Sequence, residues 1–310
     1  MKKSTKKFWI KLREYIDYSD YEHINKLKKL CEKSDESVLK LELDYKLKDS
    51  QNAEETYGLS NINEFMCYDD EILVGYIGIC SFGNHSYPLE LMGMVHPEYR
   101  KQGIFTRLNQ MALGECRRRN AGDFYLLCDR KSESGKNFLT SLGAKYNYSE
   151  FEMYLDQDIY YSLDLNLDTL SLRKATNDDA YEVTRQNKIY FEDIDDNTCV
   201  DIKEDELLFP EEEEKRGLII FIAEYNDKVV GKVNIQADNG IGGIYGLGIL
   251  PDYRGQGFGR KLLMMAVEEL KKLGVERIML QVEAENSTAL NLYKSCGFVE
   301  ESVMDYYFFR

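Results

Sequence analysis

Residues 249–260, ILPDYRGQGFGR, carry the strongest signal in the sequence. They follow an apolar, glycine-rich segment typical of a β-strand and precede a segment with helical periodicity. A glycine-rich turn at this place leaves the first backbone N–H groups of the helix unpaired and open to an approaching anion. The stretch therefore predicts a binding site for a phosphate or pyrophosphate, to which Arg254 and Arg260 would add positive charge.

Other glycine-rich phosphate sites fit this stretch less well. A Rossmann turn requires glycines in the order G-x-G-x-x-G, whereas Gly255, Gly257 and Gly259 alternate. A Walker A loop requires Gly-Lys followed by Ser or Thr, which does not occur here. An ordinary strand-to-helix turn remains the alternative, although a tight turn needs fewer glycines.

The same pattern occurs 154 residues earlier in the chain. PEYRKQG at 97–103 matches PDYRGQG at 251–257, and the register continues without a gap to Gly143 and Gly297. A period of this length is far too long for a solenoid and predicts two copies of one fold. A chain of 310 residues accommodates two domains, which we place at 1–157 and 168–310.

Hydrophobic periodicity predicts the same order of elements in both copies. In the second copy, strands are expected at 218–225, 228–237, 241–250 and 277–282, a helix at 258–273, a short helix ending at Ser295, and the last strands within 299–309. In the first copy, strands are expected at 63–68, 71–81, 89–95 and 124–128, and helices at 104–120 and 135–141. Each copy is therefore predicted to be a mixed α/β or α+β domain, with helices flanking a mostly antiparallel sheet.

Composition limits the classes of partner. The net charge of −15 falls almost entirely on residues 156–310, which contain 17 Lys and Arg against 31 Asp and Glu. Such an acidic surface repels phosphate backbones, so we expect no nucleic-acid partner. No apolar run approaches the roughly 20 residues of a membrane span. Residues 1–13 also lack the apolar core of a secretory signal, so we expect a cytoplasmic protein without membrane contact.

Cysteine and histidine usage gives no sign of a metal site. The seven cysteines have no CxxC spacing, and we expect them to be buried or half-buried thiols. The histidines are His23, His85 and His96. The second copy contains none, which excludes histidine-based catalysis there.

Two blocks of the second copy resemble the acetyl-CoA signature of the GNAT acetyltransferase superfamily. The first is Arg254-x-x-Gly257-x-Gly259, and the second is NSTALNLYKSCGF at 286–298. Their order and separation are those of the family, and the resemblance covers most of residues 170–310. Through the repeat, the whole chain resembles a tandem GNAT protein. The resemblance implies an N-acetyltransferase with acetyl-CoA as co-substrate and a small-molecule or peptide amine as acceptor.

The resemblance also implies roles for residues of the second copy. The loop would hold the CoA pyrophosphate, the strand before it the pantetheine arm and the thioester, and the second block would contact CoA from the other side. The residues expected to bind the co-substrate are Leu247, Gly248, Ile249, Arg254, Gly255, Gln256, Gly257, Phe258, Gly259, Arg260, Asn286 and Ala289. Tyr293 would be the general acid, because an O–H donor stabilises a thiolate that leaves a thioester. A core tyrosine is the alternative for Tyr293, and a simple helix cap for Asn286.

The motifs do not identify the residue that takes the proton of the amine. In the ribosomal-protein alanine acetyltransferases, which the second copy resembles best, a glutamate occupies the position of Gln281. Glu283 projects on the same strand face and is our candidate for the base. Glu224, and Glu90 in the first copy, are further candidates, with plain surface charge as the alternative.

The first copy departs from the family pattern. It keeps Arg100 and Gly103, but Phe105 replaces the last glycine, Ser132 the asparagine and Leu139 the tyrosine. We therefore expect the first copy to be non-catalytic and to serve as a scaffold, a degenerate CoA site or part of the acceptor site. A CoA-binding or sensing protein without turnover is the alternative function for the whole chain.

Overall fold

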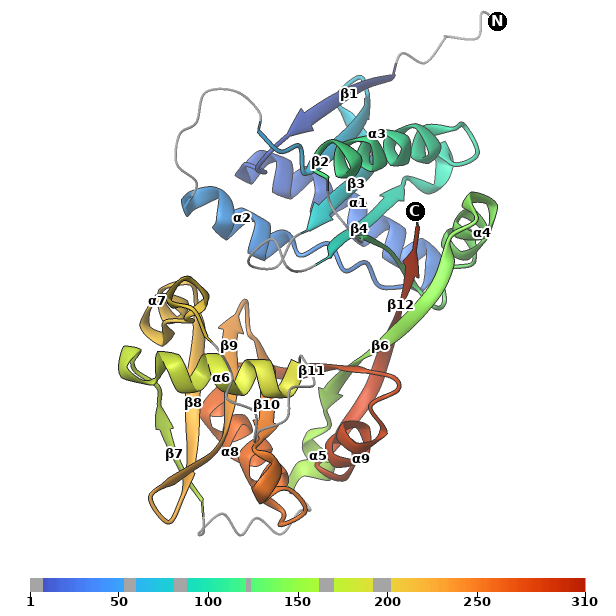
Figure 1. The fold of residues 1–310 in the computed structure, drawn as a ribbon. Helices are drawn as coiled ribbons and strands as arrows, with labels where there is room; N and C mark the ends of the chain where they lie inside the picture. The colour runs from blue at the N-terminus through green and yellow to red at the C-terminus, as the bar shows by residue number, and fades with distance from the viewer. Residues whose placement is uncertain are drawn as a thin grey trace, which may run out of the picture. The chain divides into compact units, whose positions relative to one another are not determined.

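The chain folds into two units, each built around a sheet (Figure 1). This computed structural model describes residues 8–52, 60–80, 88–120, 124–161, 170–191 and 202–309. The first unit comprises Met1–Glu150 with Ser302–Arg310, and the second comprises Phe151–Glu301. Residues 162–169, most of the stretch in which we placed the domain boundary, lie outside the described part. The domain limits 1–157 and 168–310 therefore stay a prediction.

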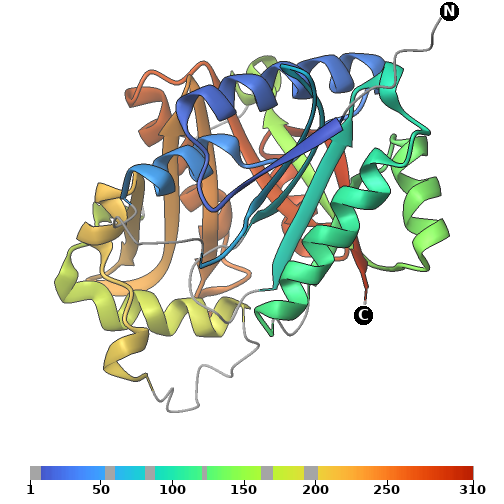
Figure 2. The same ribbon diagram turned by 90° about the horizontal axis from the view of Figure 1, so that it is seen from above.

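The sheet of the first unit has the strand order β1-β2-β3-β4-β5-β12. Its strands are β1 (Phe8–Arg13), β2 (Glu64–Asp69), β3 (Ile72–Cys80), β4 (Leu89–Val95), β5 (Phe124–Asp129) and the end of β12 (Phe298–Phe308). Neighbouring strands are antiparallel except β4 and β5, which are parallel. The helices α1 (Tyr18–Asp35) and α2 (Leu43–Asn52) cover one face, and α3 (Ile104–Arg118) with α4 (Glu133–Leu142) covers the other (Figure 2).

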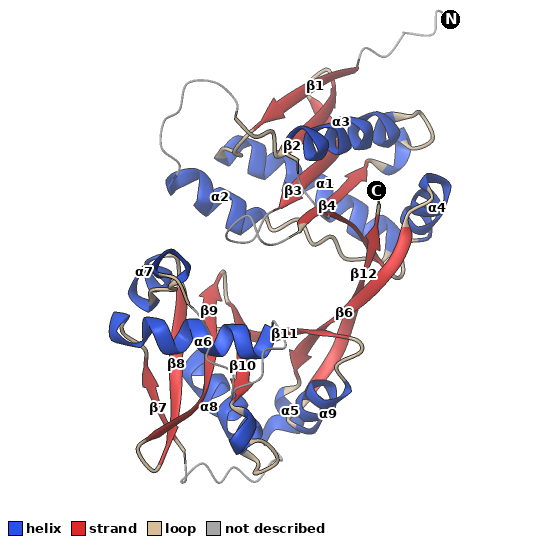
Figure 3. Cartoon of the chain, in the orientation of Figure 1, coloured by secondary structure: helices blue, strands red, loops and turns tan. Residues whose placement is uncertain are grey.

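The second unit repeats this plan with the strand order β6-β11-β10-β9-β8-β7. Its strands are β7 (Ser171–Lys174), β8 (Leu218–Tyr225), β9 (Lys228–Asp238), β10 (Ile241–Ile249), β11 (Arg277–Glu283) and the end of β6 (Lys145–Leu155). The β10–β11 pair is parallel, and the ladders from β7 to β10 are antiparallel. The helices α6 (Ala180–Phe191) and α8 (Phe258–Lys272) pack on opposite faces (Figure 3). The shorter helices are α5 (Gln157–Tyr161), α7 (Pro210–Lys215) and α9 (Ser287–Ser295).

Most predicted elements are present, with ends that differ by a residue or two, but the strands expected within 299–309 of the second copy form one strand, β12, whose end belongs to the first unit. Helix α8 shows why hydrophobic periodicity predicted the helices. Its apolar stripe, which includes Leu262, Val267 and Leu270, is fully buried in the core of the second unit. Gly274 follows this helix with a φ of 77°, as expected for a glycine after a helix end. The prediction of a mixed, mostly antiparallel sheet flanked by helices is confirmed.

Two long strands are divided between the units. Residues 304–308 of β12 pair antiparallel with residues 125–129 of β5 and complete the first sheet. Residues 151–155 of β6 belong to the second unit, whose sheet they complete beside β11. Each unit thus includes a strand that is distant in sequence from the strand beside it.

Candidate active site

Strand β10 of the second unit contains a bulge. Its register with β9 shifts between Tyr245 and Gly248, and Gly246 has a φ of 53°. The parallel pairing of β10 with β11 ends at Ile244, so the ladder with β11 does not use the backbone from 245 to 249. A bulge re-aims backbone groups and is common beside ligand sites. The bulge includes Leu247, one of the residues expected to contact the thioester.

The loop after β10 leaves the start of α8 open. Gly255 and Gly257 have φ values of 74° and 82°, and a Cβ at either position would meet no atom within 4 Å. Gly257 is the N-cap of α8 and supplies no side-chain cap, and the first turn has no acidic residue. No side-chain acceptor of that turn therefore competes for its backbone N–H groups. This arrangement fits an anion such as a pyrophosphate.

The polar side chains of the loop have different surroundings. Arg254 is exposed, and its Nε donates to the carbonyl oxygen of Ile249 at 2.9 Å. Arg260 donates to the carbonyl oxygen and to Oγ of Ser295, at 2.9 and 2.7 Å. This predicted phosphate ligand is therefore engaged with the last residue of α9. Gln256 is exposed and donates to the carbonyl oxygen of Asp252 at 3.2 Å.

Helix α9 holds the second group of predicted residues. Asn286 caps it, because its Oδ1 accepts a hydrogen bond from the N–H of Ala289 at 3.0 Å. Tyr293 is half-buried, with its ring against Phe298 at a centroid distance of 6.3 Å. Among the described residues its hydroxyl has no hydrogen-bond partner, and burial raises the pKa of Tyr293. The phenol therefore keeps its proton and is able to donate it to a ligand.

The candidates for the base lie in exposed or already paired positions. Glu283 is exposed at the end of β11, and its carbonyl oxygen accepts from the N–H of Asn286. Glu224 on β8 forms an ion pair with Arg173 at 2.7 Å. Gln281, at the position where the ribosomal-protein enzymes carry glutamate, is partly buried on β11.

One polar residue of the second unit was not identified as a functional candidate from the sequence. Lys232 on β9 lies opposite Gly248 of β10 and is completely buried. Its Nζ donates to the carbonyl oxygen of Gly246 in the bulge at 3.2 Å. A lysine in the middle of an apolar, alternating strand was the signal that could have identified it.

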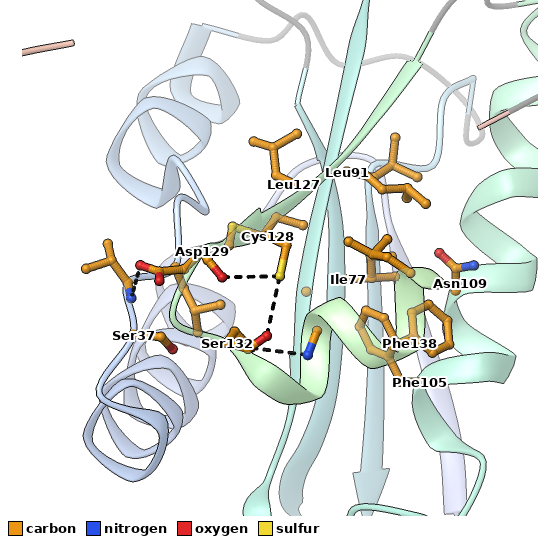
Figure 4. Close-up of a pocket in the computed structure, with 17 residues that line it drawn as sticks. Ser37, Ile77, Leu91, Phe105, Asn109, Leu127, Cys128, Asp129, Ser132 and Phe138 are labelled. Atoms are coloured by element: carbon orange, nitrogen blue, oxygen red, sulfur yellow. Dashed lines mark hydrogen bonds between the residues drawn. The ribbon is translucent and has the colours of Figure 1, made fainter. Parts of the chain in front are cut away.

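The first unit has a pocket where β4 and β5 diverge. Their parallel pairing covers only Leu89–Leu91 with Phe124–Leu126, and the pocket lies beyond it, between the strands, α3, α4 and the segment after α1 (Figure 4). Phe105 packs edge-to-face on Phe138 at 4.8 Å in its wall. In the second unit the position of Phe105 is Gly259, where a Cβ would approach only Leu292 and Ile249. The first unit therefore has an aromatic side chain at a position where the second unit has no side chain.

The polar residues of this pocket differ from the expected catalytic set. Leu139 stands where the second unit has its tyrosine, and Ser132 caps α4 by accepting from the N–H of Gly135 at 3.2 Å. Next to the pocket, Glu90 on β4 lies 3.8 Å from Nζ of Lys40, and burial raises the pKa of Glu90 to about 7. A carboxyl group with this pKa accepts a proton near neutral pH, but a phenolic donor at the tyrosine position is lacking.

The sequence model of the Acetyltransferase (GNAT) family matches residues 25–144 and 180–298. These two matches fall one in each unit and together span more than half of the chain. The chain belongs to the GNAT acetyltransferase family. The predicted tandem GNAT organisation is confirmed by this result.

Similar proteins with curated names are acetyltransferases. A mycothiol acetyltransferase of Geodermatophilus obscurus is 37% identical over 90 residues, which are 27% of this chain and 29% of that protein. An alanine N-acetyltransferase of ribosomal protein bS18 from Escherichia coli is 40% identical over 65 residues, 21% of this chain and 44% of that protein. The chain thus spans less than half the length of these relatives.

Solved structures agree with the tandem GNAT fold. A GCN5-related N-acetyltransferase from Sphaerobacter thermophilus gives a TM-score of 0.71 at 17% identity, over 97% of this chain and 95% of that one. A tandem GNAT protein from the clavulanic acid biosynthesis pathway gives 0.65 at 12% identity, over 98% of both chains. At these identities the likeness concerns the fold alone.

Three further expectations concern metals, thiols and membranes. Within the described ranges, no three His, Cys, Asp or Glu side chains lie where they would hold a metal ion together. All cysteines that the structure describes are buried free thiols, as predicted; Cys199 lies outside the described residues. Each described helix is too short or too polar to cross a membrane.

Proposed function

We propose that this protein transfers the acetyl group of acetyl-CoA directly to a primary amine, and that the second unit is catalytic. The observation that carries the proposal is the glycine-capped start of α8, which directly follows the bulged end of β10. Family membership supports acetyl-CoA as the co-substrate. The exposed backbone of the loop supplies donors for its pyrophosphate.

In the proposed binding site, the backbone of β10 and of the loop after it contacts CoA from one side, and α9 contacts CoA from the other side. The loop from Arg254 to Arg260, with Gln256 and Phe258 between the glycines, surrounds the pyrophosphate through its N–H groups. Leu247, Gly248 and Ile249 contact the pantetheine arm and the thioester, because β11 leaves this part of β10 unpaired. Asn286 and Ala289, at the start of α9, contact CoA from the other side.

Direct transfer requires one group that accepts a proton and one that donates a proton. The amine attacks the thioester carbonyl, whose oxygen is stabilised by a backbone N–H of the bulge. Tyr293 donates its proton to the departing thiolate, for which its hydroxyl is suited because it is protonated and has no hydrogen-bond partner among the described residues. Glu283, exposed at the end of β11, takes the proton of the amine through water. Glu224 is the weaker candidate, because Arg173 holds it.

We assign the first unit a supporting role. It lacks the tyrosine, and Phe105, packed on Phe138, occupies the position of Gly259 in the second unit. A scaffold or a contribution to acceptor binding is consistent with these substitutions. The acceptor class is a small-molecule or peptide amine, since the relatives are named for mycothiol and for the alanine of a ribosomal protein.

Titration of acetyl-CoA into the intact protein tests the binding step, and release of free CoA thiol tests the transfer. We expect one binding site, and thiol release that rises on addition of at least one member of a panel of alanyl peptides, polyamines and amino sugars. Binding without thiol release for every amine would favour a CoA-sensing protein without turnover. Absence of binding would overturn the proposal.

A further inference from the structure

Lys232 is a fully buried lysine. Its exposed fraction is 0%, and its Nζ donates to the carbonyl oxygen of Gly246 at 3.2 Å and to Oδ1 of Asn234 at 3.5 Å. In the part of the chain that the structure describes, no carboxylate forms an ion pair with it. Lysine is almost never buried completely unless it is paired, so this position calls for an explanation beyond packing.

The surroundings of Lys232 favour the uncharged amine. Ile222 of β8 and Gly248 of β10 are its neighbours in the sheet, and the ring of Tyr190 of α6 lies 5.9 Å from Nζ. The phenol of Tyr190, whose hydroxyl donates to Gln186, is the titratable group that faces it from these elements. Burial lowers the pKa of Lys232 to about 7. The neutral, nucleophilic amine is therefore accessible near neutral pH.

Lys232 lies at the bulge where the proposed function locates the thioester. Its acceptor Gly246 directly precedes Leu247, and a Cβ on Gly246 would come within 3.1 Å of Nζ. The absence of a side chain at Gly246 thus leaves the space that the amine occupies. An amine at this position is adjacent to the backbone proposed to hold the acetyl group.

We propose that Lys232 is a self-acetylation site of this protein, acylated by acetyl-CoA bound at the same bulge. The lone pair of Nζ attacks the thioester carbonyl carbon, a C–N bond forms and the C–S bond breaks. The thiolate leaves with the electron pair and takes up the proton that the nitrogen loses, so that the products are acetyl-lysine and CoA thiol. An amide does not pass its acetyl group to a second amine under these conditions, so this is a modification and not an intermediate of transfer.

The environment of Lys232 favours the acetylated side chain over the charged lysine. Acetylation removes a charge that burial disfavours, and the amide N–H remains able to donate to the carbonyl oxygen of Gly246. The modified side chain would add bulk beside the bulge. We therefore expect acetylated protein to bind acetyl-CoA more weakly than unmodified protein.

The inference rests on the proposed function. Mass spectrometry tests it, and the test does not require a known acceptor. The intact mass and the peptide map are recorded for the isolated protein and after incubation with acetyl-CoA. We expect one added acetyl group per chain, at Lys232, in the wild type and in Lys228→Arg, which changes an exposed lysine of the same strand. Lys232→Met and Gly257→Glu should remain unlabelled at this site. Thermal unfolding of Lys232→Met should show that the variant is folded, because methionine fills similar space without a buried charge.

The pH dependence separates self-acetylation from chemical acetylation of the surface. Labelling of Lys232 should rise through about pH 7 and then level off, following its neutral fraction. Exposed lysines, with pKa values near ~10.4, should continue to gain label at higher pH. Binding of acetyl-CoA without acetyl-Lys232, or equal labelling in Gly257→Glu, would overturn the modification alone. Absence of binding would overturn the proposed function and the modification together.

Discussion

Replacement of Gly257 by glutamate tests the proposed pyrophosphate site at its centre. Gly257 has φ and ψ of 82° and 0° and caps α8, and Gly103 caps α3 of the first unit at 78° and 2°. A Cβ at either position would meet no atom within 4 Å. Gly103→Glu is therefore a matched control for the effect of Gly257→Glu on folding.

The two variants should lose the same stability and differ in binding. A non-glycine residue in the left-handed region costs about 1–2 kcal/mol, and a carboxylate at a helix N-terminus offsets about 0.3–1 kcal/mol. We expect each variant to lose about 1 kcal/mol of unfolding free energy. In Gly257→Glu the carboxylate would also occupy the anion position. Loss of two charge-assisted hydrogen bonds at about 1.5 kcal/mol each weakens binding by about 100-fold.

Calorimetric titration of acetyl-CoA into the wild type and both variants measures this difference, and urea unfolding checks the stability term. We expect one site of equal affinity in the wild type and in Gly103→Glu, and at least ~100-fold weaker binding in Gly257→Glu. Unchanged affinity in Gly257→Glu would refute the placement of the pyrophosphate at α8. Loss of binding in Gly103→Glu alone would assign the site to the first unit.

Four further variants test the acid, the caps and an ion-pair cluster. Tyr293→Phe should lower kcat by about 100-fold or more with an unchanged Kd for acetyl-CoA, measured by steady-state kinetics and calorimetry; an unaffected kcat would remove the acid assignment. Asn286→Ala and Ser132→Ala each delete a helix cap and should each lose about 1 kcal/mol in urea unfolding, but only the first should weaken acetyl-CoA binding. Glu115 has its pKa held to about 2 by its arginine neighbours and a backbone N–H, so it stabilises the fold above its ordinary pKa and this contribution is lost as the pH falls toward 2. Glu115→Gln should therefore lower the unfolding free energy by about 2 kcal/mol at pH 7 and by almost nothing at pH 2, and an equal loss at both would contradict this linkage.

The glycine-rich stretch at 249–260 and its earlier copy were sufficient to predict the fold class. Local signals were strong in these segments, because glycine positions, helix periodicity and strand alternation all indicated the same elements. The glycine after α8, Gly274, was therefore predicted to the residue, and the cap of α9 to within one residue. Such features depend on a few neighbouring residues and need no information on distant contacts.

The membership of the last strand could not be predicted in this way. Residues 304–308 pair with β5, although the repeat would group them with the second copy. Alternation of side chains tells which face of a strand is buried, but not which sheet edge it joins. β1, α1 and α2 were also not predicted. They precede the region in which the two copies match, so the repeat gave no signal for them.

The loops before α3 and α8 have similar backbones but differ in the surroundings of their arginines. Arg100 and Arg254 both donate through Nε to the strand before them, but Arg100 also forms two hydrogen bonds of 2.8 Å with Asp35 of α1. The charge of Arg100 is thereby paired, whereas Arg254 is exposed. Both helices keep a left-handed glycine at the cap, because the turn itself requires it. The geometry of an anion site is thus present twice, and the two sites differ in the arginine, which is held by Asp35 in the first unit and exposed in the second. Acetyl-CoA is therefore expected to bind at the start of α8.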